Sequence, residues 1–493
     1  MTPPMHRQAL YTVDQVRALD RRAIEQLGIP GYELMHRAAM AALTRLRRHW
    51  PSARRLAVYA GKGNNGGDGF LLAALAAEAG LHVDVWAVAG ASQGDAAKAR
   101  QACEAAHVRI VDGVSEIIVE ADVLVDALYG TGLRRAPEGE IAALVERINA
   151  SGKPVLALDV PSGLDADTGR CPGVAIHASV TVSFIAAKRG LYTGKAAACV
   201  GRLELDTLGL PDALWSASQP FAQVLMPHGL PRRARDAHKG NNGHVLAIGG
   251  DHGTAGAIRL CGEAALRTGA GLVSVATQAD NIVALNSARP ELMAHAVHGP
   301  QELETLLEKA TVLAIGPGLG QAGWGHALWL TALDSGKPFV LDADGLNLLA
   351  REPRRFTQPA VITPHPGEAA RLLGMTTKDI EADRYSAVLD LARRFQVVAV
   401  LKGAGSLIAT PDGRIAVCPW GNPGMATGGM GDLLTGVVAA LLAQGCDPWD
   451  AACLGVGLHA RAGDLAAGDG GERGLMASDL LLPLRRLCNE EAA

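Results

Sequence analysis

The sequence predicts an α/β fold made of two doubly wound domains. At 493 residues the chain is longer than one ordinary domain. In both halves, short apolar segments alternate with helical patterns and lead into glycine-rich turns, which is typical of parallel sheets covered by helices on both faces. Prolines at positions 211, 220, 227 and 231 interrupt this pattern. We therefore predict a boundary near Met226, with domains at 1–225 and 226–493.

The composition indicates a globular chain. Hydrophobic residues make up 48% of the sequence and charged residues 19%, which suits a buried core. A net charge of −4 gives no indication of a nucleic acid partner. The eight cysteines form no CxxC pair, so we expect reduced thiols and neither a zinc site nor a disulfide framework. Without an apolar signal segment or membrane-length apolar span, we expect a soluble cytoplasmic protein with no membrane partner.

The first domain begins with two helical patterns and then a strand, a glycine turn and a helix. Thr12 and Gln15 have the spacing of a capping box. An apolar strand at 56–60 leads into GKGNNGGDG and a helix predicted over 70–79. This order is typical of the phosphate site of a doubly wound sheet, but the spacing is not GxGxxG, which disfavours an ordinary dinucleotide dehydrogenase. The glycines leave Asn64, Asn65 and Asp68 accessible to a ligand.

Further strand–helix units follow at 82–88, 122–133, 154–169 and 179–190. In each unit polar residues cluster just after the apolar strand. Ligands of such sheets bind beyond the carboxyl ends of the strands, so we expect these loops to converge. Asp126, Asp159 and Ser162 would each, taken alone, be a turn or cap residue, but as a set they favour a site.

The second domain repeats the alternation of strand and helix. Its strand-like segments lie at 244–251, 270–277, 311–320, 338–347, 360–369 and 397–409. The segment NPGMATGGMGDLLTG at 422–436 then leads into an apolar run from Leu433 to Leu442 that we predict as a buried helix. Glycines that open a helix expose backbone N–H groups at its positive end, which suits an anion such as phosphate. Asp432 beside that anion is either a helix cap or a base for proton abstraction.

The motifs of the first half resemble a known family. GxGNNGGDG, VDALYGTGL and DVPSGLDADTG, in this order, are similar to the Rossmann-like NAD(P)H-hydrate epimerase domain over about Tyr11 to Leu210. The resemblance implies Asp159 as the leading acid/base group and Lys188 as a second one, although Lys188 reads equally well as a surface lysine. It also implies a potassium ion bound by Asn65, Asp126 and Ser162. The implied contacts of the hydrated dinucleotide, besides Asp159, are Asn64, Asn65, Gly66, Gly67, Asp68, Gly130, Thr131, Gly132, Leu133, Arg134, Arg135 and Ala136.

This half also departs from the family pattern. Ala187 stands where the family usually has proline, and GYELMHRAA, with His36 and Arg37, replaces LMExAG. The family's helix at this place helps to line the site or a subunit interface. We expect the protein to form a homo-oligomer. The departures at Ala187, His36 and Arg37 leave open a second, non-enzymatic interpretation, in which this half is a nucleotide-sensing module.

The second half resembles the ADP/ATP-dependent NAD(P)H-hydrate dehydratases, which have a ribokinase-like fold. The resemblance rests on IGPGLG, LDADGLN, TPHPGE, LKGAGS and NPGMATGGMGDLLTG, and covers about Arg235 to Leu487. It implies that Asp432 is the catalytic base and contacts the substrate together with Ala257, Gly318 and His365. Magnesium is implied with ADP. The implied ADP contacts are Lys402, Gly403, Ala404, Gly405, Ser406 and Gly431.

The two resemblances together imply a repair enzyme for NADH or NADPH hydrated at carbon 6 of the nicotinamide ring (NADHX and NADPHX). The first domain would interconvert the R and S forms, and the second would dehydrate the S form at the expense of ADP. A small-molecule kinase is the alternative, because a glycine loop with Asp432 would serve equally well to phosphorylate an alcohol with ATP.

Overall fold

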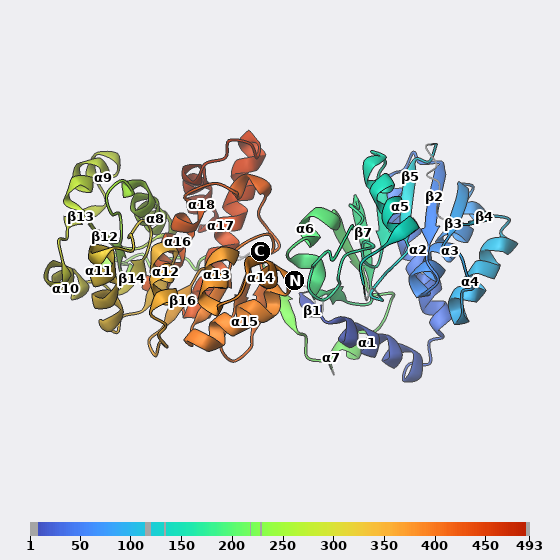
Figure 1. Cartoon of the computed structure of the whole chain (residues 1–493), viewed down its shortest axis with the longest axis horizontal. Helices are drawn as coiled ribbons and strands as arrows, with labels where there is room; N and C mark the ends of the chain where they lie inside the picture. The colour runs from blue at the N-terminus through green and yellow to red at the C-terminus, as the bar shows by residue number, and fades with distance from the viewer. Residues whose placement is uncertain (1–7, 114–119, 133–134, 217, 227–228, 490–493) are drawn as a thin grey trace. The chain divides into compact units, whose positions relative to one another are not determined.

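The computed structural model describes residues 8–113, 120–132, 135–216, 218–226 and 229–489. The chain divides into two compact units, Met1–Gln223 and Val224–Ala493, drawn from blue to green and from yellow-green to red in Figure 1. Each unit carries helices on both faces of a mostly parallel sheet, so the predicted α/β fold class is confirmed. Within the described ranges, no helix is long and apolar enough to cross a membrane.

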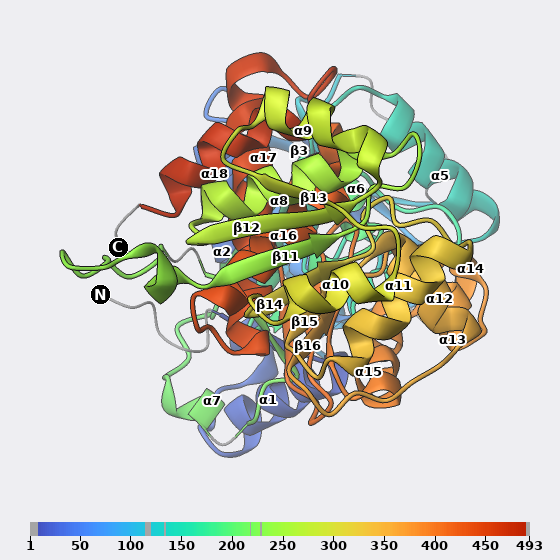
Figure 2. The same ribbon diagram turned by 90° about the vertical axis from the view of Figure 1, so that its left-hand side faces the viewer.

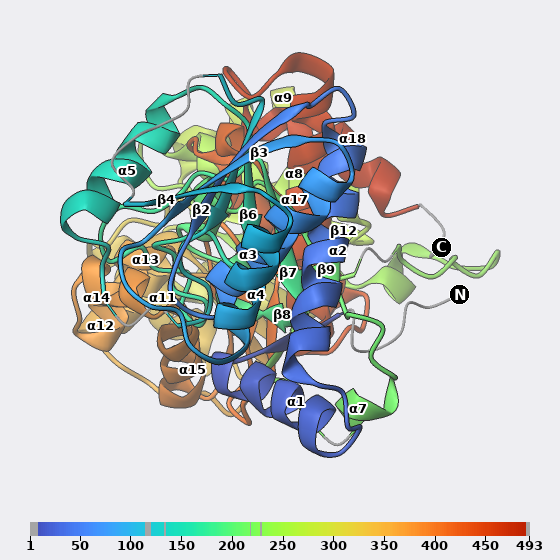
Figure 3. The ribbon, with the colours of Figure 1, turned by 90° about the vertical axis from the view of Figure 1, so that its right-hand side faces the viewer.

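The first unit contains a parallel sheet in the order β4-β3-β2-β5-β6-β7-β9. Alternate residues of β2 face opposite sides: Val58 joins the core beneath α2 and α3, whereas Tyr59 packs with residues of α5. Figure 3 shows α2, α3 and α4 on one face and α5 on the other. The strands are β1 (Ala9–Tyr11), β2 (Arg55–Ala60), β3 (His82–Ala87), β4 (Arg109–Asp112), β5 (Val123–Ala127), β6 (Val155–Leu158), β7 (Val180–Phe184), β8 (Ala187–Lys188), β9 (Arg202–Asp206) and β10 (Ala222–Val224). The helices are α1 (Val13–Glu25), α2 (Gly31–His49), α3 (Asn64–Glu78), α4 (Gly94–Ala105), α5 (Gly139–Ala150), α6 (Ala196–Cys199) and α7 (Ala213–Ser216).

Two local predictions in this unit can be compared directly with the structure. The capping box at α1 is confirmed: Gln15 N donates to Thr12 Oγ1 at 3.2 Å and Thr12 N to Gln15 Oε1 at 2.9 Å. The helix predicted over 70–79 instead begins at Asn64, because the glycines of the turn are helical packing residues. A Cβ on Gly66 would lie 1.9 Å from the Gly61 carbonyl oxygen, and one on Gly69 2.5 Å from the Ala127 Cβ. The glycines thus allow α3 to pack closely against the sheet.

The second unit contains parallel strands in the order β13-β12-β11-β14-β15-β16-β17, followed by antiparallel β18 and β19. Figure 2 shows α8, α16, α17 and α18 on one side of these strands and α11, α12, α13 and α15 on the other. The strands are β11 (His244–Ile248), β12 (Leu272–Thr277), β13 (Met293–Ala296), β14 (Val312–Ile315), β15 (Phe339–Leu341), β16 (Ala360–Ile362), β17 (Val398–Leu401), β18 (Leu407–Ala409) and β19 (Ile415–Val417). The helices are α8 (Ala255–Thr268), α9 (Ile282–Ala288), α10 (Pro300–Leu307), α11 (Gly323–Asp334), α12 (Ala343–Arg351), α13 (Pro366–Leu373), α14 (Thr377–Ala382), α15 (Arg384–Phe395), α16 (Met430–Ala443), α17 (Pro448–Gly470) and α18 (Leu481–Leu487).

The buried helix predicted after the glycine-rich segment is confirmed as α16. Every residue from Leu433 to Leu442 is buried, and the helix packs against α8 and α17. Close packing against α8 depends on Gly436, where a Cβ would lie 2.0 Å from the carbonyl oxygen of Cys261. The core of the unit therefore holds α16 in place and fixes the position of its N-terminus.

Candidate active sites

The first unit contains a cavity of about 800 Å³ at the carboxyl ends of its parallel strands. The loops after β2, β5, β6 and β7 contribute to its wall, together with α1 and α2. Strand ends of a doubly wound sheet are where ligands bind. Among the residues predicted from the sequence, those that line this cavity are Asn64, Asn65, Asp68, Gly130, Thr131, Gly132, Asp159 and Lys188.

Lys188 and Asp159 form a buried ion pair in this cavity. The side chain of Lys188 is 1% exposed; its ammonium donates to a carboxylate oxygen of Asp159, to Ser183 Oγ at 3.0 Å and to the Phe184 carbonyl at 2.8 Å. Asp159 has a φ of 64°, in the left-handed region that non-glycine residues rarely adopt. Such strain concentrates at functional sites. Because the side chain of Lys188 is buried, the alternative interpretation of Lys188 as a surface lysine is wrong.

Asp126 and Ser162 are buried together behind the cavity wall. Ser162 donates from its hydroxyl to Asp126 Oδ1 at 2.6 Å and from its backbone N–H to Asp126 Oδ2 at 2.7 Å. Burial raises the pKa of Asp126 to about 6, although these hydrogen bonds oppose the rise. Asn65 lies on α3, and within the described ranges both polar atoms of its buried amide lack a hydrogen-bond partner. A buried amide of this kind can take a water molecule, an ion or a ligand as its partner.

Other predicted residues of this unit do not line the cavity. Gly66 and Gly67 pack inside the fold, where a Cβ on Gly67 would lie 2.6 Å from Met35 Sδ. Arg135 is exposed and Ala136 is half-buried, also outside the cavity lining. The predicted contacts Leu133 and Arg134 lie outside the described residues.

The sequence departures of this unit can also be placed. Arg37 pairs with Glu33 and donates to the carbonyl of Leu208 at 3.1 Å, and Leu208 itself lines the cavity. His36 and Arg37 line a separate shallow hollow. Ala187 lies in β8, which pairs with β1. Sequence reasoning missed Asp20, which α1 brings to the cavity without any local motif.

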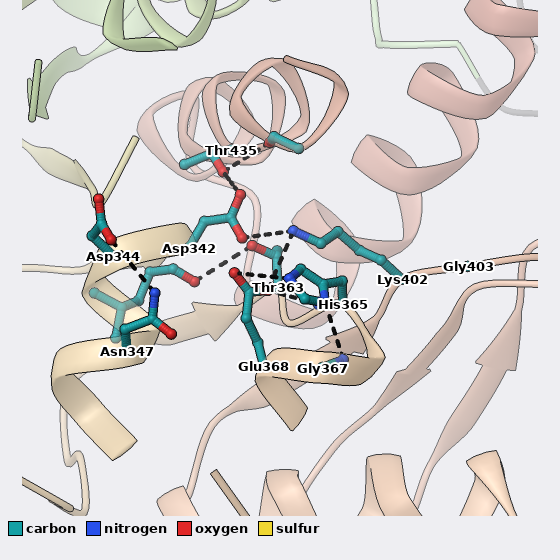
Figure 4. A network of polar contacts seen from close by, with 12 residues as sticks. Asp342, Asp344, Asn347, Thr363, His365, Gly367, Glu368, Lys402, Gly403 and Thr435 are labelled. Carbon is teal, nitrogen blue, oxygen red and sulfur yellow. Dashed lines mark hydrogen bonds and ion pairs between the residues drawn. The ribbon is translucent and has the colours of Figure 1, made fainter. Parts of the chain in front are cut away.

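In the second unit, Lys402 lies in a network of carboxylates and hydroxyls that Figure 4 shows from close by. Its ammonium lies 2.7 Å from Asp342 Oδ1 and 3.8 Å from Glu368 Oε2. Thr435, on α16, donates to Asp342 Oδ2 at 2.9 Å. Burial lowers the pKa of Lys402, but the charges of Asp342 and Glu368 outweigh burial and the net shift is upward. Sequence reasoning missed Asp342, although it follows β15 directly in the LDADGLN segment that it noted.

The N-terminus of α16 adjoins this lysine. A Cβ on Gly431 would lie 3.1 Å from Lys402 Nζ and 3.2 Å from Asp342 Oδ2, so the lysine reaches the first turn of the helix. The first N–H groups of a helix lack intrahelical partners and attract anions. Asp432 lies in the same turn. Burial raises its pKa to about 6, the charge of Asp342 adds to the rise, and Lys402 opposes it.

Arg384 supports the loop of residues 402–406 through hydrogen bonds to its backbone. Sequence reasoning missed this residue. Arg384 is 1% exposed and donates from Nη2 to the carbonyls of Leu401 and Lys402, at 3.3 and 3.1 Å. A Cβ on Gly403, where φ is 138°, would lie 2.9 Å from this guanidinium. Ser406 closes the turn, accepting from the N–H of Gly403 at 3.2 Å. Nothing near Arg384 in the sequence signals this role.

The remaining predicted residues lie on neighbouring loops. Thr254 joins two of them: its hydroxyl donates to the carbonyl of Gly318 at 2.8 Å, and its carbonyl accepts from the N–H of Ala257 at 3.1 Å. The side chain of His365 is 52% exposed, and its Nδ1 accepts from the N–H of Gly367 at 3.0 Å, so it caps α13. Burial and the charge of Lys402 lower the pKa of His365, which favours a neutral ring.

Comparisons with known proteins agree with the division of the chain into two units. Residues 31–190 match the family described as YjeF-related protein N-terminus, and residues 245–484 match the family described as NAD(P)H-hydrate dehydratase. The bifunctional NAD(P)H-hydrate repair enzyme Nnr of Coxiella burnetii is 48% identical, over 97% of this chain and 99% of that protein. The enzyme of the same name from Escherichia coli is 46% identical, over 98% of this chain and 94% of that protein.

A solved structure of an ADP/ATP-dependent NAD(P)H-hydrate dehydratase from Bacillus subtilis, co-crystallised with ATP and Mg²⁺, is 32% identical. It matches 52% of this chain and 93% of that chain, with a TM-score of 0.49. Identity close to one half over nearly the full length of both proteins shows the family. The chain belongs to the family of bifunctional NAD(P)H-hydrate repair enzymes.

Proposed function

We propose that the chain restores hydrated nicotinamide dinucleotides in two steps. The first unit interconverts the R and S forms of NADHX and NADPHX. The second unit dehydrates the S form to NADH or NADPH at the expense of ADP. The observation that carries the proposal is the second site, where an aspartate and a lysine meet at the glycine-rich start of a buried helix in a chain that belongs to this family.

In the first unit, Asp159 and Lys188 are the catalytic pair, and the residues that line the cavity hold the dinucleotide. Potassium fits the group of Asn65, Asp126 and Ser162, because the amide oxygen of Asn65 lacks a partner in the described part of the chain and hard cations prefer oxygen ligands. When bound, potassium would supply a fixed positive charge that orders the substrate and keeps Asp126 ionised. Of the remaining contacts, we propose Gly66, Gly67, Arg135 and Ala136 only as supports of the loops around the cavity.

In the second unit, Asp432 takes the proton of the carbon 6 hydroxyl as the hydroxyl oxygen attacks the β-phosphorus of ADP. The bond from this phosphorus to the bridging oxygen breaks and AMP leaves. Lys402 and the N–H groups at the start of α16 stabilise the charge on the transferred phosphoryl group. The phosphate ester then leaves carbon 6, a proton leaves carbon 5, and the ring double bond is restored. Phosphorylation thus converts a poor leaving group into a good one.

Ligand contacts in the second unit follow from the same geometry. We propose that Ala257, Gly318 and His365 contact the hydrated dinucleotide, since their loops adjoin one another or the Lys402 network. Magnesium would enter with ADP, because Mg²⁺ is usually held largely by substrate phosphates and water. The proposed ADP contacts are Lys402, Gly403, Ala404, Gly405, Ser406 and Gly431.

The test is recovery of the reduced nicotinamide absorbance from purified S hydrate by the purified chain. We expect recovery only with ADP and release of one AMP per nicotinamide. The alternative of a small-molecule kinase predicts phosphate transfer from ATP to thiazole or pyrimidine alcohols and no recovery from the hydrate. Those two results together would replace the repair function with a kinase function.

A further inference from the structure

The α1 helix brings the carboxylate of Asp20 into the cavity of the first unit. Val16, Asp20 and Ile24 all line the cavity, and their spacing of four residues places them on one face of α1. Asp20 therefore lies between two apolar side chains on the cavity side of the helix. Its pKa is raised by burial, although the nearby charges of Lys188 and Arg21 oppose the rise and that of Asp159 adds to it.

The position of α1 is fixed by long-range contacts. β1 pairs in parallel with β8, with Tyr11 opposite Lys188 in the register. The helix begins two residues later, where the N–H of Val13 donates to Asp167 Oδ1 at 3.0 Å. The chain thus anchors the start of α1 beside the strand that carries Lys188. Asp20 follows two turns along the helix.

The four carboxylates that line the cavity differ in their partners. Asp159 pairs with Lys188, and Asp95 pairs with Lys98 at 2.8 Å. Asp20 and Asp68, by contrast, have no hydrogen bond or ion pair with any other described residue. Burial raises the pKa of Asp68 well above its usual range, and the charges of Asp159 and Asp20 add to the rise. Neighbouring carboxylates that cannot all ionise hold a proton available for transfer.

We propose that Asp20 is a catalytic residue of epimerisation, acting as the acid opposite the Asp159–Lys188 pair. This inference rests on the proposed function of the first unit. In the substrate, carbon 6 carries a hydroxyl group and is bonded to the ring nitrogen N1. Asp159 accepts the hydroxyl proton, and the electron pair of that O–H bond forms a C=O bond. The C6–N1 bond breaks, its electron pair stays on N1, and N1 takes the proton of Asp20.

Ring closure reverses these transfers on the other face of the carbonyl. N1 returns its proton to Asp20 while it attacks carbon 6, and the carbonyl oxygen regains the proton held by Asp159. The product is the other epimer, with every atom and proton conserved. No oxidant or further reactant is required. The reaction needs an acid and a base in one cavity, and Asp20 supplies the acid because the Lys188 ammonium already donates to Asp159, Ser183 and Phe184.

The experiment compares Asp20→Asn, Asp20→Glu and the control Asp14→Asn in the full chain, with pure R hydrate converted through the second unit in excess ADP. Asp14 lies on the same helix, and its side chain is 95% exposed. We expect Asp20→Asn to lower kcat for epimerisation by about 10²-fold or more with little change in KM, because the amide cannot donate the proton. Asp20→Glu should restore part of the rate, and Asp14→Asn should match the wild type.

The pH profile separates catalysis from packing. In the wild type, kcat should fall as the pH rises through the pKa of Asp20, because only the protonated acid can donate; Asp20→Asn should lose this alkaline limb. Dehydration of pure S hydrate by the same variant reports that the second unit is active, and thermal unfolding reports whether the first unit is folded. A kcat for Asp20→Asn within about threefold of the wild type, or a change in KM alone, would overturn the assignment. A wild-type chain that uses S but not R hydrate would instead contradict the proposed epimerase function.

Discussion

At the scale of single residues, each site places a lysine against an aspartate. Lys188 with Asp159 and Lys402 with Asp342 are both held by further hydrogen bonds, so their positions are set before a ligand arrives. In the second site this pairing leaves Asp432 as a separate carboxylate near the lysine. Asp432 is therefore the carboxylate of this site that is available to accept a proton. This division of tasks gives two predictions.

We predict that Asp432→Asn abolishes ADP-dependent dehydration, with a loss of about 10²–10⁴-fold, because the base is removed. Epimerisation should remain, since Asp432 belongs to the second unit. The measurement is the recovery rate from pure S hydrate, with the exposed Asp469→Asn of α17 as the matched control. The wild-type rate should fall as pH drops through about 6, the raised pKa of Asp432, because protonation disables a base. Near-wild-type dehydration by Asp432→Asn would contradict this role.

We also predict that Asp159→Asn blocks use of the R hydrate and leaves use of the S hydrate intact. The change leaves the buried ammonium of Lys188 without its counter-charge, so we expect a loss of stability of about 3–5 kcal/mol as well. Rates on separate R and S substrates, together with thermal unfolding, distinguish the two effects. Combining Asp159→Asn with Lys188→Met should recover stability but not R hydrate use. An equal loss on both substrates in a folded variant would refute the assignment.

At the scale of helices and strands, strand ends and helix starts position every group in both sites. The second site depends on how closely Lys402 approaches α16. We predict that Gly431→Ala raises KM for ADP several-fold, because its Cβ would lie 3.1 Å from Lys402 Nζ and displace the ammonium. Gly468→Ala, which adds a methyl group in open space on α17, is the control. An unchanged KM for ADP in Gly431→Ala would show that this approach is not needed for nucleotide binding.

Elements with a local signal could be predicted from the sequence. Apolar strands followed by glycine turns gave the strand ends, and with them Asp159, Asp126 and the loop at Lys402. The predicted start of α3 was wrong. Its glycines indicate a loop in the sequence, but in the structure they belong to the helix and allow it to pack closely. Asp20 and Arg384 could not be found, because each reaches its site through a contact between segments distant in sequence. Periodicity and motifs report on neighbours along the chain and not on such pairings.

At the scale of the whole molecule, the two units have separate hydrophobic cores, and each carries one complete constellation of lysine and carboxylates. The chemistry of the substrate gives a reason for joining them in one chain. Dehydration of the S form alone would leave the R form unused. An epimerase in the same chain keeps its concentration matched to that of the dehydratase.

The most direct test of this account uses a mixture of the R and S forms of NADHX, with potassium present and the purified chain in excess. We predict that the near-ultraviolet absorbance of the reduced nicotinamide recovers almost completely with ADP and not without it. Recovery that stops at the S fraction would contradict epimerisation by the first unit. Absence of any ADP-dependent recovery would contradict the account as a whole.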